Sequence, residues 1–522
     1  MNDNPKKSEK TGLFSRPGFW LCAALLLLPF MVTNDSLWLD EGDTARYVMQ
    51  PDLHSWWDCL RHDGQADCQM PLAFLYSWVA GKLWNTQEWQ LRAINLLWGA
   101  LAVAGMYRAG RRLQMPWLPL LLAIQPYFWF YTNEARPYAL QMAGGAWLLV
   151  ALVEFYFARA AGTAWAWLLA GAGFFLFCGT LLAPLPVAAT VLAGGFIAWR
   201  QGWKPERKAV MILLGSLVAW VPVGIYYLST LLRGAKGAQV WHVDMKFFAY
   251  VVYELTGLGG IGLSDEDIRE LARSPHLLHD LSAHAPQLLL PVLALGLLAA
   301  IFFLGWRGRS ASPVYGLPGL GIFLVLGLTA GVFFTGSLVL QKAFWARHFA
   351  PVFPFYVTLL GLAFAGVWKI AGAWRRGLPL ALCGLFILSA LNFRFAPSLR
   401  KEDYRSAAAF VRPLVAANKN VWWLAGGYAA TYYGLACIEP HPEPGKVFVA
   451  FRYASHGGGD LRDLPLPDLV VYSKPYIHDP GGIVQGIMQR NHYEEVAHFK
   501  SFTVWTNAAA AINHEAGMIT NR

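Results

Sequence analysis

The sequence has little charge for its length. Only 14% of its 522 residues are Asp, Glu, Lys or Arg, whereas 56% are hydrophobic. A soluble protein of this size carries about a quarter charged residues, so the composition argues against a soluble enzyme. Apolar runs of about 15 to 22 residues recur along the chain, and they indicate a polytopic α-helical membrane protein.

Other absences narrow the class further. The first apolar run, residues 18–33, lacks a small-residue cleavage site, so we expect a retained first helix rather than a cleaved signal. No internal repeat is visible, whereas many transporters are built from repeated halves. The net charge of +10 comes from basic residues in short loops, where membrane orientation explains them, so no nucleic-acid partner is predicted.

Cysteine is also scarce, with six residues in the whole chain. Cys59 and Cys68 share a polar loop that we expect to be external, where a disulfide can form in a bacterial periplasm. Two free thiols are the alternative. A zinc site that adds His62 is disfavoured, because the spacing of the two cysteines is not a usual ligand pattern.

The apolar runs predict about 11 to 13 membrane spans. The short apolar segment 71–84 is interpreted as a juxtamembrane or re-entrant helix. The expected spans are residues 18–33, 90–109, 116–131, 138–158, 164–180, 183–199, 209–230, 286–305, 316–338, 349–368 and 377–392.

Basic residues mark alternate ends of these spans, as in RQGWKPERK at 200–208. Placing them in the cytoplasm puts the N-terminus inside and the loops 34–89 and 231–285 outside. We therefore predict a membrane-embedded module over residues 1–394, in a bacterial inner membrane. Residues 395–522 are predicted to be a small external, periplasmic α/β domain, because charge returns there with strand-like and amphipathic segments.

Charged residues beside the spans gather on the external side. Asp40, Glu41 and Asp43 follow the first span, and NEARPY at 133–138 joins the third and fourth. QKAFWARH at 341–348 joins the ninth and tenth. Charge at membrane depth costs several kcal/mol unless it is paired or hydrated, so such groups usually line a cavity. If these loops converge, they form one pocket that holds carboxylates and cations together.

Transfer of a group from a phosphate needs both kinds of side chain. A carboxylate removes the proton from the attacking hydroxyl or amine. Fixed cations stabilise the charge that develops on the departing phosphate. A site at membrane level suits a lipid-linked donor.

Each residue also has a structural alternative. Asp40 and Glu41 fit solvated loop acids, and Glu134 with Arg136 fits an ion pair at a helix junction, since Pro137 suits a first helical turn. The remaining candidates have interfacial or ordinary polar alternatives; these are Lys342, Arg347, His348 and Tyr138.

Four segments in chain order resemble the GT-C superfamily of integral membrane glycosyltransferases. The nearest likeness is to the family that joins protein O-mannosyltransferases with bacterial aminoarabinose transferases. The segments are LDEGDTARY at 39–47, the stretch 69–103, QPYFWFYTNEARPYALQM at 125–142 and KAFWARHFAPVFPFYVTLLGLAF at 342–364. The likeness covers about residues 15 to 395.

This resemblance implies a polyprenyl-phosphate-linked sugar donor, undecaprenyl phosphate in bacteria, and transfer with inversion on the external face. The partners implied are that donor, the lipid bilayer and an acceptor that is a protein, a lipid or a polysaccharide. Asp40 matches the catalytic base, Glu41 its partner and Glu134 the second acidic position.

The predicted substrate-binding residues are Arg136, Tyr138, Lys342, Arg347 and His348. The family often has His or Lys before two prolines where this chain has Gln69, which carries no charge, so the role of holding phosphate shifts to the other cations. A divalent metal is known in some relatives, but no clear ligand set is visible here, so no cofactor is assigned.

Two other functions remain open at this point. A transporter or flippase for a lipid-linked glycan would also need many spans and charged residues at membrane depth. A non-catalytic subunit of a glycan-assembly complex would use the external domain for docking.

Overall fold

The computed structural model describes residues 17–62, 66–232, 243–264, 267–268, 271, 277–308, 316–370, 372–438, 442–443, 445–450 and 460–507. The predicted loop 231–285 therefore lies partly outside the described residues. The chain divides into two compact units. The first comprises Met1–Thr33, Trp57–Tyr76 and Arg92–Leu399, and the second comprises Asn34–Trp56, Ser77–Leu91 and Arg400–Arg522. The second unit thus takes in two parts of the first loop, beyond the C-terminal region that the sequence predicts.

Each predicted span is largely helical in the structure. The corresponding helices are α1 (Pro17–Leu27) with η2 (Leu28–Met31), α5 (Glu88–Arg112), α6 (Leu118–Ala123) with α7 (Pro126–Thr132), α8 (Tyr138–Phe157), α9 (Ala164–Gly179), α10 (Pro184–Gln201), α11 (Arg207–Leu232), α15 (Ala285–Arg307), α16 (Leu317–Leu340), η7 (Ala346–Val352) with α17 (Phe353–Ile370), and α18 (Ala373–Phe395). Shorter helices join them: α3 (Leu53–His62), η3 (Ala66–Gln69), α4 (Pro71–Leu83), α12 (Met245–Thr256), η4 (Leu258–Ile261), α14 (Leu277–Ala283) and η8 (Pro397–Leu399).

Within the described residues, six helical segments are long and apolar enough to cross a membrane. The chain is therefore a multi-pass membrane protein. The remaining predicted spans are shorter, interrupted or flanked by charge, so the count of about 11 to 13 spans stays a prediction.

Proline divides the predicted span 116–131 into two helices. Gln125 is extended, with φ −70° and ψ 127°, and α7 begins at Pro126. A proline lacks the N–H that a continuous helix requires, and it disfavours the helical conformation of the residue before it. The predicted span 116–131 is therefore made of two helices, α6 and α7, with a break at Gln125.

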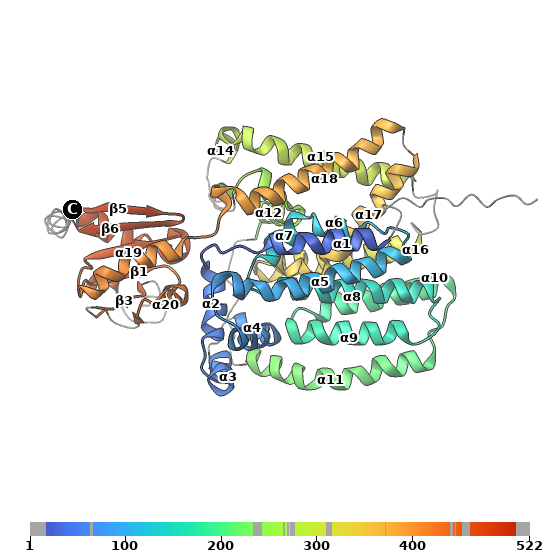
Figure 1. Ribbon diagram of the computed structural model, residues 1–522, viewed down its shortest axis with the longest axis horizontal. Coiled ribbons are helices and arrows are strands. Elements are labelled where there is room, and N and C mark those ends of the chain that lie inside the picture. Colours follow the sequence, from blue (N-terminus) through green and yellow to red (C-terminus); the bar gives the residue numbers. More distant parts are fainter. Residues whose placement is uncertain are drawn as a thin grey trace, which may run out of the picture. The chain divides into compact units, whose positions relative to one another are not determined.

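Helix α8 lies inside the first unit and α11 lies at its edge. In their most apolar windows 83% of α8 is buried, against 6% of α11. Figure 1 shows α8, α9 and α11 side by side, and they are neighbours in the order α8, α9, α11. An apolar helix with so little burial inside the protein is one that faces lipid.

The second unit contains a six-stranded mixed sheet in the order β2-β3-β1-β4-β6-β5. Strands β2, β3, β1 and β4 are parallel, whereas β6 pairs antiparallel with both β4 and β5. The bounds are β1 (Val421–Leu424), β2 (Cys437–Ile438), β3 (Val447–Phe448), β4 (Leu469–Tyr472), β5 (Tyr493–Phe499) and β6 (Phe502–Asn507). The α/β character predicted for the C-terminal region is confirmed.

Helices cover both faces of this sheet. Trp423 belongs to a core with α19 (Tyr404–Ala416) and α20 (Gly427–Tyr432), while its neighbour Trp422 points to a core with α23 (Ile483–Arg490). Successive side chains of a strand face opposite sides, so the adjacent tryptophans anchor two separate layers. Figure 1 shows α19 and α20 beside the strands. The short helices α22 (Pro475–His478) and η9 (Leu461–Asp463) complete the unit.

Candidate active site

The acids that follow the first span lie at the start of a helix in the second unit. Helix α2 (Leu39–Val48) carries Asp40 and Glu41 in its first turn. The positive end of the helix dipole stabilises carboxylates at this position. Glu41 is fully buried, whereas Asp40 and Asp43 are half-buried.

Glu41 is held from two directions. Its Oε1 lies 2.9 Å from the Nζ of Lys401, and its Oε2 accepts a hydrogen bond of 3.4 Å from the backbone N–H of Trp38. The second contact is the return arm of a capping box, which satisfies an N–H at the helix start. Glu41 therefore holds α2 in place, and Asp40 is the adjacent carboxylate that reaches the surface.

A second buried ion pair joins Lys474 to Glu402. Lys474 adopts φ +44°, a left-handed conformation that costs of order 1–3 kcal/mol for a residue with a side chain. Its ammonium lies 5.8 Å from the ring centre of Trp38, the residue that precedes α2. The strained backbone thus delivers a cation to the start of the acidic helix.

The pKa of Tyr404 is affected by acids from two parts of the second unit. Burial raises the pKa of its phenol well above the usual value, and the charges of Glu402, Asp43 and Asp40 raise it further. The phenol oxygen accepts a hydrogen bond of 3.0 Å from the backbone N–H of Gly426. Acids from α2 and from the start of the C-terminal region therefore lie close enough to Tyr404 for their charges to raise its pKa.

Close contact between α2 and α20 sets the position of the acidic helix. A Cβ placed on Gly42 would lie 2.7 Å from the Cβ and the backbone nitrogen of Ala429. Real Cβ atoms do not approach neighbours this closely, because interiors are already packed to high density. Only glycine allows α2 to rest on α20 in this way.

We expect Gly42→Ala to lower the melting temperature of the protein, because the methyl group pushes α2 away from α20 at a cost of about 1–3 kcal/mol. Gly486→Ala is the matched control, since Gly486 lies in helix α23 with nothing within 4 Å of its added Cβ. Alanine is favoured over glycine in helices by about 0.5–1 kcal/mol, so the control should raise the melting temperature. Thermal unfolding of both variants measures this. Equal shifts in one direction would contradict the close contact.

The charged segment 133–138, predicted to join the third and fourth spans, lies in the first unit between α7 and α8. Arg136 there makes an ion pair with Asp67, with 2.8 Å between Nη2 and Oδ1, and both side chains are buried. Glu134 is 2% exposed, and its backbone carbonyl accepts a hydrogen bond from the side-chain amide of Asn95. The charged loop is therefore an inner part of the unit and not a solvated surface loop.

Aromatic residues extend this cluster. The ring of Tyr138 packs edge-on against Tyr131, with 4.9 Å between ring centres. The hydroxyl of Tyr131 donates a hydrogen bond of 2.5 Å to Oε1 of Glu254 in α12. Tyr127, one turn earlier, donates a hydrogen bond of 2.9 Å to the carbonyl of Ala346, the first residue of η7.

The basic segment before the tenth predicted span lies beside α8. A Cβ on Gly145 of α8 would lie 1.8 Å from the carbonyl oxygen of Pro351, so η7 sits directly on this glycine. Arg347 and His348 belong to η7 and are half-buried, while Lys342 is exposed. The structure thus brings the elements that carry Glu134, Arg136, Tyr138, Arg347 and His348 together in the first unit. That Asp40 and Glu134 share one chamber stays a prediction, because they belong to different units.

No protein-family model and no curated protein matches the sequence. The structure resembles ArnT from Cupriavidus metallidurans in the apo state, with a TM-score of 0.53 and 12% identity, over 94% of this chain and 98% of that one. It also resembles ArnT from the same organism bound to undecaprenyl phosphate, with a TM-score of 0.51, 13% identity and the same coverage.

The chain has the GT-C fold. This confirms the predicted fold class, a polytopic helical membrane protein with a small C-terminal α/β domain. The likeness extends along nearly the whole of both chains, so the GT-C architecture includes the sheet-containing region as well as the helices.

Several buried or paired charged residues of the two units were not predicted from the sequence. Asp67 pairs with the predicted Arg136, and Lys401 pairs with the predicted Glu41. Glu254 accepts a hydrogen bond from Tyr131, and Glu402 and Lys474 pair with each other. The signal for Glu254 was present, since it is the only acid in the apolar helix MKFFAYVVYELT. The others lie in polar stretches, where a charged residue is unremarkable in the sequence.

The predicted disulfide and the metal question concern residues of the first loop and of the whole described chain. Cys59 lies half-buried in α3 and Cys68 lies buried in η3, and their disulfide stays a prediction. Within the ranges that the structure describes, no three His, Cys, Asp or Glu side chains gather as a metal site.

Proposed function

We propose that this protein transfers a sugar from a polyprenyl-phosphate-linked donor to an acceptor on the external face of a bacterial inner membrane. The observation that carries the proposal is the GT-C fold, shared along 94% of the chain with an ArnT structure bound to undecaprenyl phosphate. The N-terminus is proposed to be cytoplasmic and the C-terminal domain periplasmic, as the distribution of basic residues favours.

Asp40 is proposed as the general base. It is the half-buried carboxylate next to Glu41, whose two oxygens are both engaged, so α2 holds Asp40 in one orientation. Asp40 takes the proton of the acceptor hydroxyl as that oxygen attacks the anomeric carbon. The bond from that carbon to the phosphate oxygen breaks in the same displacement, so the configuration inverts and polyprenyl phosphate leaves.

The donor phosphate is proposed to meet the cations of the first unit. Arg347 and His348 in η7 are half-buried, and Lys342 lies exposed nearby in the sequence. A partly buried guanidinium binds phosphate strongly, because it presents paired N–H donors in a region of low dielectric.

Arg136, Glu134 and Tyr138 are proposed to complete the donor site. Arg136 is paired with Asp67, so it orients the loop and supports Glu134 as well as supplying charge. Tyr138 offers an aromatic face near that loop, next to Tyr131. A fixed set of charges and rings favours transfer because it needs little rearrangement as charge develops on the phosphate.

The deciding experiment uses purified protein in lipid vesicles, a polyprenyl-phosphate sugar labelled in the sugar, and envelope material from cells that lack the gene as acceptor. We expect polyprenyl phosphate to be released and label to enter the acceptor, and both to require the protein and the acceptor together. Movement of intact lipid between leaflets without cleavage would instead indicate a flippase. Neither cleavage nor movement would indicate a non-catalytic subunit.

A further inference from the structure

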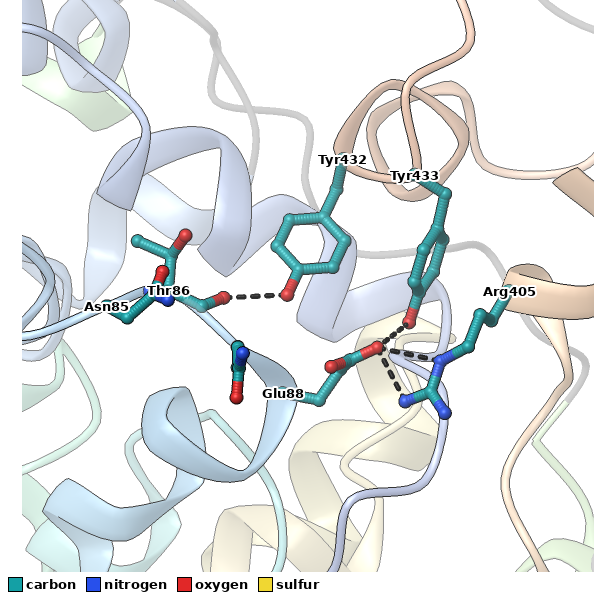
Figure 2. Close-up of a pocket in the computed structure, with 7 residues that line it drawn as sticks. Asn85, Thr86, Glu88, Arg405, Tyr432 and Tyr433 are labelled. Atoms are coloured by element: carbon teal, nitrogen blue, oxygen red, sulfur yellow. Dashed lines mark hydrogen bonds and ion pairs between the residues drawn. The ribbon is translucent and has the colours of Figure 1, made fainter. Parts of the chain in front are cut away.

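The second unit contains a pocket whose lining includes none of the residues proposed above for catalysis or donor binding. It has a volume of about 350 Å³ and is lined by residues 85–88, by Arg405 at the start of α19, and by Tyr432 and Tyr433 at the end of α20 (Figure 2). This volume lies at the lower end of the range for small-molecule sites, roughly 300–1,000 Å³. The pocket therefore has room for about one or two small rings.

Glu88 forms the rigid floor of this pocket. Its Oε1 accepts hydrogen bonds from Nε and Nη2 of Arg405, at 3.0 and 2.6 Å, and from the hydroxyl of Tyr433 at 3.0 Å. Burial, with Glu88 alongside, raises the pKa of Tyr433 to about 12, so its hydroxyl remains a donor. All three bonds fall on Oε1, and Figure 2 shows the other carboxylate oxygen turned toward the open space beneath Tyr432.

Tyr432 forms one wall. Its hydroxyl donates a hydrogen bond of 2.6 Å to the backbone carbonyl of Thr86, and its ring packs edge-on against Tyr433 with 4.9 Å between centres. The ring is therefore held at both ends and cannot swing into the cavity. A fixed aromatic face beside hydrogen-bonding groups can stack on the C–H face of a pyranose ring.

Two amide side chains stand at the rim. Asn85 and Gln87 are exposed, and Oε1 of Gln87 accepts a hydrogen bond of 3.0 Å from the indole N–H of Trp89. That bond orients the amide, so its NH₂ group remains available as a donor. The pocket thus offers both a fixed acceptor at Glu88 and a fixed donor at Gln87, the pair that a sugar hydroxyl can use at once.

The charge of the pocket points to a neutral ligand. Its lining contains one carboxylate and one guanidinium, and they neutralise each other in a pair with 2.6 Å between the nearest atoms. A phosphate would meet the outward oxygen of Glu88 with no uncompensated cation to offset it, which is unfavourable. A polyhydroxylated neutral ring meets no such penalty.

We infer that this pocket binds a neutral sugar residue. We assign this sugar to the acceptor, and that assignment rests on the proposed function. The binding of a sugar in the pocket does not depend on the proposed function. Fixed hydrogen-bond partners and a fixed ring reduce the ordering cost of binding, which suits a weak but selective saccharide site.

The test uses the full-length protein in detergent and the methyl glycosides of glucose, galactose, mannose and N-acetylglucosamine, with binding followed by saturation-transfer NMR. We expect at least one glycoside to bind, and Tyr432→Ala and Gln87→Ala each to weaken that binding at least tenfold. Tyr432→Phe keeps the ring and should retain most of it. The matched control is Gln485→Ala, an exposed glutamine on α23, which should bind as the native protein does.

Thermal unfolding of each variant separates loss of binding from loss of fold. If Tyr432→Ala does not fold, the milder variants Tyr432→Phe and Gln87→Ala still test whether the pocket binds the glycoside. The inference is overturned if no glycoside binds, if the pocket variants bind as Gln485→Ala does, or if inorganic phosphate displaces the glycoside. Glycoside binding without sugar transfer would defeat only the proposed function. Sugar transfer without glycoside binding would defeat only this inference.

Discussion

Asp40→Asn is expected to lower sugar transfer by about 100- to 10,000-fold, the range that a general base contributes. Asparagine has nearly the same shape as aspartate but cannot take a proton. Glu41 and Lys401, which hold α2, are untouched by the change, so the fold and donor binding should persist. Acceptor-dependent release of polyprenyl phosphate measures the rate, and thermal unfolding confirms that the variant is folded.

Asp43→Asn is the control for this prediction. Asp43 lies on the same helix as Asp40, is half-buried like it, and also raises the pKa of Tyr404. The substitution Asp43→Asn therefore removes an equivalent local charge without touching Asp40. We expect transfer in Asp43→Asn to fall far less than in Asp40→Asn. Full activity in Asp40→Asn, or an equal loss in both variants, would end the assignment of Asp40 as the base.

Lys401→Met is expected to lower the free energy of unfolding of the second unit by about 3–5 kcal/mol. Glu41 is fully buried and Lys401 is 10% exposed, so removing the lysine leaves a buried carboxylate without its compensating charge. Chemical denaturation monitored by tryptophan fluorescence reports this, since Trp422 and Trp423 lie fully buried in the two cores of the unit.

The control is Lys446→Met in the same unit. Lys446 pairs with Glu443 at a similar distance of 2.7 Å, but those two side chains are 45% and 55% exposed. Exposed pairs contribute about 0–1 kcal/mol, so this variant should unfold almost as the native protein does. The double variant Glu41→Gln with Lys401→Met should recover part of the loss, because no charge is then buried alone. If Lys401→Met and Lys446→Met lowered the free energy of unfolding equally, burial of the Lys401–Glu41 pair would not contribute to stability.

The helical spans were predictable because their signal is local. A run such as residues 209–230 is apolar throughout, and any structure that places it in lipid must satisfy its backbone hydrogen bonds within the run itself, as a helix. Helix α11 (Arg207–Leu232) matches it within two residues at each end. Strands β1 and β4 lie in the C-terminal region, where the sequence predicts strand-like segments from its apolar patterns.

The helix break at Gln125 could also have been predicted from the sequence, because Pro126 follows it directly. The predicted span 116–131 rested on hydrophobicity, which does not address whether the helix within it is continuous. Hydrophobicity decides whether a segment enters the membrane, but a proline within it decides whether the helix is continuous.

The partners of the charged residues were not readable. Glu41 meets Lys401 across 360 positions of sequence, and Glu88 meets Arg405 across 317. Many other lysines and arginines were equally available to each acid on sequence grounds. Burial likewise distinguished the neighbours Asp40 and Glu41, which look alike in the sequence.

Composition and the order of apolar and polar segments were enough to predict a many-helix membrane protein with a small C-terminal α/β domain, because both follow from short-range chemistry of the chain. The GT-C fold was expected only from the resemblance of four segments to that superfamily. The choice of partner for each charge, the division of the first loop between two units and the pocket at Glu88 arose from folding. Those features depend on which distant segments come into contact, and a contact between distant segments leaves no mark on either segment alone.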